Sequence, residues 1–323
     1  MKMIQALWHT SPQTSEIITT TLPPQPSNTL EIESHFSLVS AGTETLVATG
    51  TVPVALHTAM QVPYMDGDFN FPIKYAYSLV GKVVTKAHEW SGKMVHVMHP
   101  HQDRTQVAID DLSLIPNSIP ARRACLASNL ETAVNAVWDA QVMVGDRVLL
   151  VGFGLIGSLV ARILAGIPGV DLWILERDAQ RIALAQQLGF SQVVSQLDQR
   201  NFDLAFNAST AAAGLQKAID VVGLEGKVIE LSWYGENNVE LQLGATFHYQ
   251  RKKIISSQVG QLPSSHRARW DYRRRKQLVF ELLKDEKYDL HLSHDIAFAA
   301  TPKLFDRLRK GDRSALAWCI NYK

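Results

Sequence analysis

The sequence of 323 residues has few cysteines, no long apolar run and almost no net charge. Its two cysteines, Cys125 and Cys319, are too few for a disulfide framework or a cysteine-based zinc site. No run approaches the roughly 20 apolar residues of a membrane-spanning helix, and the amino-terminal stretch lacks the pattern of a secretory signal. The formal net charge of +1 favours neither nucleic acid nor a membrane surface as a partner. We therefore expect a cytoplasmic protein that acts on a small molecule.

The most informative segment is a glycine-rich turn between two apolar runs. Residues 148–151 form the first run and lead into Gly152, Gly154 and Gly157, after which an apolar helical pattern follows. A second apolar run then ends at Glu176. Gly152 permits a tight turn, Gly154 lets the backbone approach a pyrophosphate, and Gly157 lets the helix pack closely on the strand. The order of strand, turn, helix, strand and acid predicts a dinucleotide site.

The same segment predicts how a dinucleotide is held and which one is preferred. Its phosphates would lie at the helix N-terminus, where the N–H groups of Leu155 and Ile156 have no helical partner. Glu176 stands where an acid binds both hydroxyls of the adenosine ribose and repels a 2′-phosphate, which predicts NAD. Arg177 can pair with that phosphate, so NADP is the alternative.

Polar residues follow two later apolar runs of this region. Asn207 and Ser209 come after one run, and Ser232 comes after the next. Ligands of open α/β sheets bind at the carboxyl ends of the strands. We therefore expect these residues to line the nicotinamide side of the site.

The order of the expected elements predicts two domains. Residues 1–120 read as β-rich, residues 121–262 alternate strands and helices around a parallel sheet wound on both sides, and residues 263–323 are expected to rejoin the first domain. Strands are expected at residues 30–38, 79–84, 94–98, 106–109, 172–175, 192–194, 204–207, 227–231, 254–257 and 316–321. Helices are expected at residues 121–140, 179–188, 212–222, 268–284 and 302–310.

This plan and three local motifs resemble the medium-chain dehydrogenase/reductase superfamily. Residues 41–44 (AGTE) are placed like the family's Cys-Gly-Thr-Asp, residues 76–81 (AYSLVG) like Gly-His-Glu-x-x-Gly, and residues 145–148 (GDRV) like the entry to the cofactor strand. The sequences of the first two motifs are also similar to those of a branch that includes bacteriochlorophyllide-type dehydrogenases. The resemblance implies a GroES-like catalytic domain, a Rossmann domain and a homodimer. It also implies hydride transfer between a nicotinamide and an alcohol, a carbonyl or an activated alkene.

The sequence departs from the family at the positions that hold catalytic zinc. Ala41 replaces the cysteine, Tyr77 the histidine and Ser78 the adjacent glutamate, while Glu131 stands where some members carry a glutamate near the metal. One carboxylate does not hold zinc, because catalytic sites usually have three protein ligands. We therefore expect a member without zinc.

Three residues are candidates for the chemistry, each with a structural alternative. The resemblance places Thr43 at the position whose hydroxyl relays a proton, although it can equally bond its own loop. Tyr77 can donate to a carbonyl oxygen or form an aromatic wall of the pocket. Glu131 can accept a proton near the nicotinamide or be an ordinary hydrogen-bonded acid.

Two other classes of function stay open at this point. One is a zinc enzyme that uses His99, His101 and Glu131, since two histidines two positions apart on a strand face the same side. The other is a nucleotide-binding sensor without catalytic activity.

Overall fold

The structure, a computed structural model, describes residues 2–323 and contains two compact units. Unit 1 comprises residues 2–128 and 280–323, and unit 2 comprises residues 129–279. The divisions at 128/129 and 279/280 fall inside helices α3 (Ala127–Ala140) and α8 (Tyr272–Leu282). Hydrophobic periodicity shows where a helix begins and ends, but it does not show that the two halves of one helix pack in different cores. The boundaries expected from the sequence, at 120/121 and 262/263, therefore lie at the ends of expected elements.

Unit 1 contains two antiparallel-rich sheets. The first has the strand order β2-β1-β5-β4, and the second has the order β16-β17-β3-β6-β7-β9 with β8 also paired to β3. The strands are β1 (Met3–Ser11), β2 (Thr14–Thr21), β3 (Thr29–Val39), β4 (Asp66–Gly67), β5 (Ile73–Lys74), β6 (Leu79–Val83), β7 (Met94–Val97), β8 (Arg104–Ala108), β9 (Ser113–Leu114), β16 (His294–Ala297) and β17 (Trp318–Asn321). The helices of unit 1 are α1 (Ala41–Ala48), α2 (Ala121–Ala124) and α9 (Thr301–Arg309), with short 3-10 turns at Val54–Leu56, Ile109–Asp111, Glu286–His291 and Phe298–Ala300.

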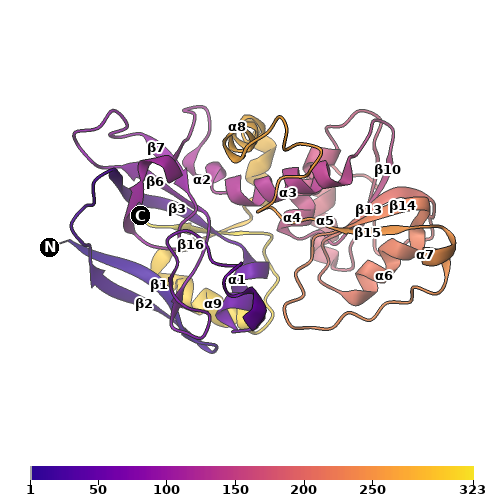
Figure 1. Ribbon diagram of the computed structural model, residues 1–323, viewed down its shortest axis with the longest axis horizontal. Coiled ribbons are helices and arrows are strands. Elements are labelled where there is room, and N and C mark those ends of the chain that lie inside the picture. The colour runs from indigo at the N-terminus through magenta and orange to yellow at the C-terminus, as the bar shows by residue number, and fades with distance from the viewer. Residues whose placement is uncertain (1) are drawn as a thin grey trace. The chain divides into compact units, whose positions relative to one another are not determined.

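The carboxyl-terminal segment completes the core of unit 1. Strand β17 pairs antiparallel with β3, and Leu304 and Phe305 of α9 pack with Leu7 of β1 and Trp318 of β17. Figure 1 shows the yellow α9 beside the indigo β1 and β2. Each such buried side chain contributes roughly 1.5–3 kcal/mol through removal from water. Residues 280–323 therefore share one core with the strands at the start of the chain.

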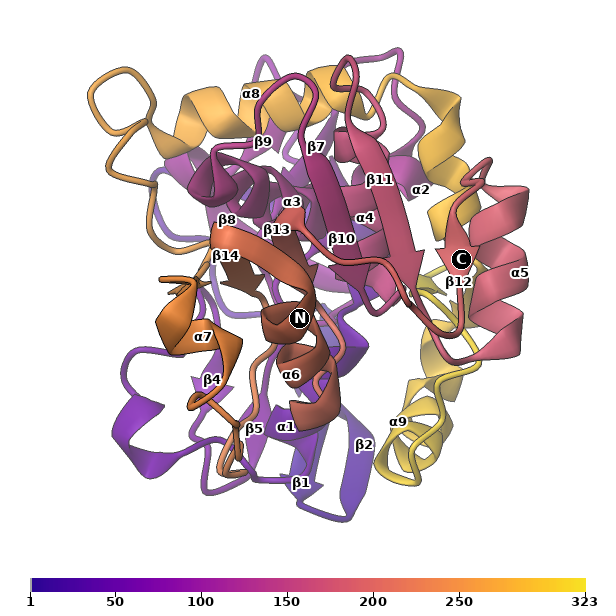
Figure 2. The same cartoon turned by 90° about the vertical axis from the view of Figure 1, so that its right-hand side faces the viewer.

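Unit 2 is a parallel sheet with the strand order β12-β11-β10-β13-β14-β15. Figure 2 shows β10 and β11 running side by side in the same direction. The strands are β10 (Arg147–Val151), β11 (Asp171–Leu175), β12 (Val193–Val194), β13 (Phe202–Asn207), β14 (Val222–Glu230) and β15 (Lys253–Ser256). The helices are α4 (Leu155–Leu164), α5 (Ala179–Gln187), α6 (Ala212–Val221) and α7 (Thr246–Tyr249). This order confirms the predicted Rossmann arrangement, in which the strand order reverses between β10 and β13.

Strand β10 lies in the interior of this sheet, and both of its faces are buried. Leu149 and Val151 pack in one cluster with Leu215 and Ile219 of α6. Because side chains alternate along a strand, Val148 and Leu150 point to the opposite face, and both are fully buried as well. A central strand covered on both faces holds the glycine turn that follows it in a fixed position.

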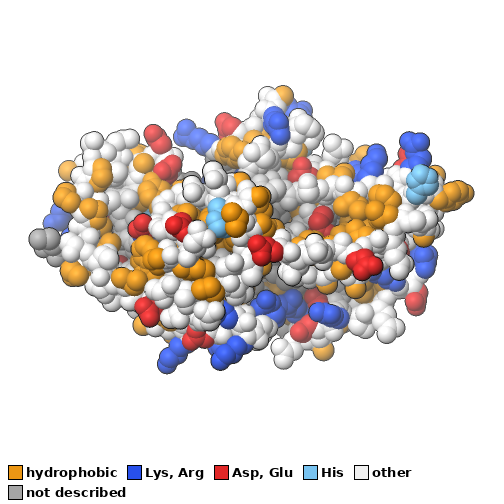
Figure 3. All heavy atoms as spheres, turned by 60° about the horizontal axis from the view of Figure 1, so that its bottom comes forward, with side chains coloured by type: hydrophobic (Ala, Val, Ile, Leu, Met, Phe, Trp, Pro, Cys, Tyr) orange, Lys and Arg blue, Asp and Glu red, His pale blue; other side chains and the backbone are white. Residues whose placement is uncertain are grey.

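The surface carries charges of both signs. On the face shown in Figure 3, acidic and basic side chains are interspersed rather than gathered into a field of one sign. Within residues 2–323, none of the helices has the length and apolar character that crossing a membrane requires.

Candidate functional site

The glycine turn after β10 has a backbone that requires glycine at two positions. Gly152 has a φ of +92°, and a Cβ atom there would lie 2.8 Å from Cα of Ser209. A Cβ atom at Gly157 would lie 2.2 Å from the carbonyl oxygen of Gly152. At Gly154, by contrast, the nearest atom to an added Cβ is a guanidinium nitrogen of Arg181 at 4.0 Å. The turn therefore leaves room for an anion at the N-terminus of α4.

Leu155 and Ile156 are the first two residues of α4, and Gly154 at the N-cap offers no side chain to bond their N–H groups. An uncapped helix start of this kind suits a phosphate, since free N–H groups and the helix dipole both favour negative charge. The positively charged Arg181, close to Gly154, adds to that preference. Sequence reasoning missed Arg181, which lies on α5 and comes near the turn only through the fold.

Glu176 follows β11 and connects the turn to the next loop. One carboxylate oxygen accepts the N–H of Phe153 at 2.7 Å, and the other accepts those of Arg177 at 2.8 Å and Asp178 at 3.0 Å. The residue is only 7% exposed. Because each carboxylate oxygen has two lone pairs, the oxygen bonded to Phe153 can still accept from a ribose hydroxyl. Arg177 points into solvent, and Asp178 caps α5.

The carboxyl ends of β13 and β14 bring together the polar residues expected there. The Ser209 hydroxyl donates to the side-chain oxygen of Asn207 at 2.7 Å, and the Ser232 hydroxyl accepts the N–H of Thr210 at 3.0 Å. Asn207 is fully buried. These residues form one hydrogen-bonded edge of unit 2, where ligands of such sheets bind.

The same edge holds two residues that the sequence reasoning did not assign. The Glu230 carboxylate accepts from the Asn207 side-chain amide at 2.8 Å and from the hydroxyl of Tyr234 at 3.3 Å. Burial and the neighbouring Glu230 charge raise the pKa of Tyr234. The available signal was an acid that directly follows the apolar pair Val228 and Ile229 at the carboxyl end of β14.

In unit 1, Thr43 lies half-buried on α1, next to a fully buried acid. One oxygen of Glu44 accepts the N–H of Ser40 at 2.7 Å, and the other lies 2.9 Å from Nε2 of His101. Nδ1 of His101 contacts the Ser37 hydroxyl at 2.8 Å. Glu44 therefore fixes the turn into α1, and Thr43 is carried on a rigid support.

Tyr77 contacts Tyr75, whose ring is buried in unit 1. The two rings are 6.3 Å apart in an edge-to-face arrangement. Burial raises the pKa of Tyr75, with smaller contributions from Tyr77 and the Glu44 charge. The charge of Glu44 on α1 is therefore near enough to act on Tyr75, whose ring contacts that of Tyr77.

The family's zinc-ligand positions carry no suitable donor set. Ala41 has only a methyl group, and the Ser78 hydroxyl donates to the carbonyl oxygen of Cys125 at 2.6 Å. A tyrosine and a hydrogen-bonded serine do not form the three-ligand set that catalytic zinc usually has. The residues present at these positions therefore do not fit the metal.

The alternative ligands are engaged by other partners. His99 contacts the carbonyl oxygen of Pro100 through Nδ1 and the hydroxyl of Thr105 through Nε2, and burial lowers its pKa to about 3. The carboxylate of Glu131 pairs with Arg275 at 3.3 Å and with Lys276 at 2.5 Å. Across residues 2–323, no group of three or more His, Cys, Asp or Glu side chains is arranged to hold a metal.

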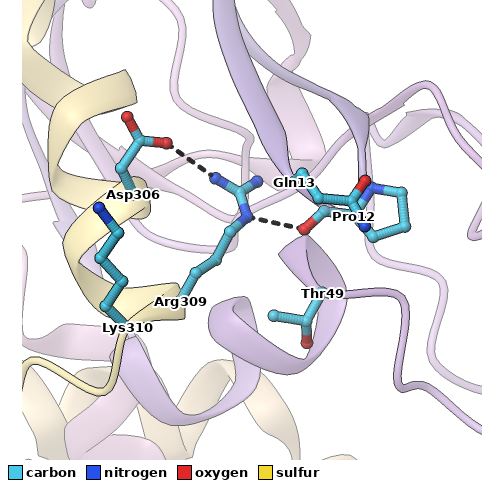
Figure 4. Close-up of a pocket in the computed structure, with 6 residues that line it drawn as sticks. All are labelled: Pro12, Gln13, Thr49, Asp306, Arg309 and Lys310. Carbon is cyan, nitrogen blue, oxygen red and sulfur yellow. Dashed lines mark hydrogen bonds and ion pairs between the residues drawn. The ribbon is translucent and has the colours of Figure 1, made fainter.

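Unit 1 also contains a hollow of about 430 Å³ that none of the predicted site residues lines. Its lining is Pro12, Gln13, Thr49, Asp306, Arg309 and Lys310. Figure 4 shows the Arg309 guanidinium turned toward Asp306 and toward the Pro12 carbonyl oxygen, which it bonds at 2.9 Å. Arg309 thus braces α9 against the β1–β2 turn.

Comparisons with known proteins place this geometry in context. No family model matches the sequence. The chain is 27% identical over 170 residues to an uncharacterized zinc-type alcohol dehydrogenase-like protein of Escherichia coli, covering 47% of this chain and 46% of that protein. It is 22% identical over 224 residues to (R,R)-butanediol dehydrogenase of Bacillus subtilis, covering 52% and 65%. The chain therefore spans less than two thirds of the length of these curated relatives.

Solved structures agree over the whole chain. The B. subtilis butanediol dehydrogenase structure has a TM-score of 0.79 at 17% identity and covers 100% of both chains. An alcohol dehydrogenase of E. coli, solved with NADH, has a TM-score of 0.78 at 13% identity, again covering 100% of both chains. The predicted fold, a GroES-like domain with a Rossmann domain, is confirmed. The sequence relatives and structural neighbours of this chain are zinc-type alcohol dehydrogenase-like proteins of the medium-chain dehydrogenase family, and the chain shares their fold.

Proposed function

We propose that the protein is an NAD(P)-dependent oxidoreductase that transfers hydride between a nicotinamide and an alcohol or carbonyl carbon. The observation that carries this proposal is the turn in unit 2. Gly152 and Gly157 allow its close packing, Gly154 leaves the start of α4 open, and Arg181 supplies positive charge beside it. A bound nicotinamide would accept or donate the hydride, while the protein holds it in place.

Glu176 supports NAD as the preferred cofactor. Its carboxylate is fixed by three backbone N–H groups, so it cannot swing away from a ligand at the end of β11. A fixed negative charge repels the 2′-phosphate of NADP and accepts from the hydroxyls of NAD. Arg177 is exposed, and its pairing with a phosphate would have to overcome that repulsion.

We further propose that the chemistry proceeds without catalytic zinc. The hydroxyl groups of Thr43 and Tyr77 would then hold the substrate oxygen and move the proton at that atom. Hydrogen-bond donors of this kind contribute typically about 10²- to 10⁴-fold in rate. Support for the assignment comes from Ala41 and Ser78, which replace the ligands expected at those positions.

A matched pair of glycine substitutions tests the cofactor site. An added Cβ atom would meet only a guanidinium nitrogen of Arg181, at 4.0 Å, at Gly154 and no atom within 4 Å at Gly244 of unit 2, so valine at either position should leave the fold intact. Only Gly154 lies at the start of α4. We expect G154V to weaken NADH binding at least about tenfold, because the side chain fills the space for the pyrophosphate. G244V should bind as the wild type does, with both melting temperatures close to the wild-type value.

Activity is tested by following nicotinamide absorbance over a panel of alcohols, aldehydes, ketones and enones. Turnover by the wild type and its loss in G154V would support the oxidoreductase. Binding of NADH without turnover over the whole panel would favour a nucleotide sensor instead. Equal NADH affinity in G154V and the wild type would overturn the assignment of the turn.

A further inference from the structure

The side chain of Glu230 lies at the carboxyl edge of the sheet in unit 2. Glu230 is the last residue of β14, and one of its oxygens accepts the N–H of Ser232, two residues beyond, at 2.7 Å. The other oxygen accepts from Asn207, the last residue of the neighbouring β13, at 2.8 Å. Asn207 and Glu230 are register partners at the ends of neighbouring strands, so the carboxylate lies at the carboxyl edge of the sheet, on the face that both side chains share.

This carboxylate has hydrogen-bond donors but no cation. Its partners are a backbone N–H, a side-chain amide and the hydroxyl of Tyr234, all of which are neutral. None of the ion pairs found within residues 2–323 includes Glu230, whereas Glu131 pairs with Arg275 and Lys276. The negative charge of Glu230 is therefore held in place without being neutralised.

We propose that Glu230 makes the protein bind oxidised nicotinamide dinucleotide more tightly, relative to the reduced form, than the same site would without its charge. The inference rests on the proposed function, because it places the nicotinamide at this edge of the sheet. NAD⁺ and NADH share the adenosine and the pyrophosphate and differ by the positive charge on the nicotinamide ring. A fixed negative charge nearby stabilises only the charged ring.

A purely structural role predicts a different outcome. Glu230 anchors Asn207 and the loop with Ser232 and Tyr234, so its loss can disturb the site as a whole. That disturbance would weaken NAD⁺ and NADH alike. The ratio of the two dissociation constants, Kd for NAD⁺ over Kd for NADH, separates charge from anchoring.

The experiment measures Kd for NAD⁺, NADH and ADP-ribose by calorimetry with the full chain. Glu230→Gln removes the charge and keeps the size, and we expect it to raise the ratio about three- to tenfold, with ADP-ribose changing less than NAD⁺. A tenfold change corresponds to about 30 mV in the potential of the bound couple. Tyr234→Phe removes a hydrogen bond but no charge. Glu225→Gln removes a charge at an exposed site earlier in β14, where Glu225 pairs with Arg251. Neither control should move the ratio.

The outcomes separate the inference from the proposed function. If the wild type binds none of the three ligands, the proposed function is overturned and the inference falls with it. If the wild type binds them and Glu230→Gln leaves the ratio unchanged, only the inference is overturned. Should Glu230→Gln fail to fold, Ser232→Lys adds positive charge at the same edge and is expected to raise the ratio, and an unchanged ratio there overturns the inference equally.

Discussion

Replacing Glu176 should weaken both the fold of unit 2 and its preference between cofactors. Glutamine offers one acceptor oxygen where the carboxylate offers two. It can therefore keep either the bond to Phe153 or the pair to Arg177 and Asp178, but not both. The bond to Phe153 holds the glycine turn, so its loss also loosens the phosphate site.

The magnitude follows from the number and type of bonds lost. A hydrogen bond to a charged group contributes about 1.5–3 kcal/mol, so we expect E176Q to lower the free energy of unfolding by about 2 kcal/mol. E176A removes all three bonds and should cost about 5 kcal/mol. Without the negative charge, the ratio of NADPH affinity to NADH affinity should rise in both variants.

Urea unfolding followed by circular dichroism and titration with NADH and NADPH measure the two effects. Asp178→Ala is the matched control, because Asp178 caps α5 through the N–H groups of Gln180 and Arg181 and has no bond to the turn. It should cost about 1 kcal/mol and leave the cofactor ratio unchanged. An E176Q protein with wild-type unfolding free energy and wild-type cofactor ratio would refute this account of Glu176.

Three further results are expected. Glu131→Ala leaves the largely buried Arg275 and Lys276 without their carboxylate and should lower the unfolding free energy by about 3 kcal/mol in urea melts; no change would contradict the pairing. Burial lowers the pKa of His99 to about 3, so between pH 6.5 and 3 the unfolded chain binds a proton that the folded chain excludes. The free energy of unfolding should therefore fall as the pH drops through this window. It should fall less steeply in His99→Gln. Strand β15 is an edge strand with Ile254 37% exposed, and such an edge can pair with that of a second copy of the chain. Light scattering should therefore give twice 35.9 kDa for the wild type, whereas the added charge of Ile254→Lys should leave a monomer.

Much of the fold could be predicted because its strands are short apolar runs separated by helical patterns. Strands β10, β11 and β13 of unit 2 fall where the sequence predicts them. The sequence does not predict β1 and β2. Burial alternates at the start of β1, but its apolar residues fall on both faces, and β2 is rich in threonine and mostly exposed. Helix α1 was missed because its start contains glycine and threonine, which favour helices weakly.

The candidate site could be predicted only where its residues lie close together in the sequence. The turn from Gly152 to Gly157 and the acid Glu176 belong to one local unit, whose chemistry is readable from spacing. The pairing of Glu44 with His101 joins residues far apart in the chain, and no pattern in the sequence indicates it. The partners of Glu131 on α8 are hidden for the same reason.

The interrupted path of unit 1 has a consequence for the protein during translation. Unit 2 is one continuous stretch, residues 129–279, so it can fold on the ribosome as soon as that stretch has emerged. Unit 1 cannot, because Leu7 packs against Phe305 and Trp318, and β3 lacks its partner β17 until residues 318–321 have left the exit tunnel. The nascent chain therefore carries an open sheet edge and uncovered apolar surface for most of its synthesis. Chaperones that shield such surfaces should determine how much of the newly made protein reaches the native state.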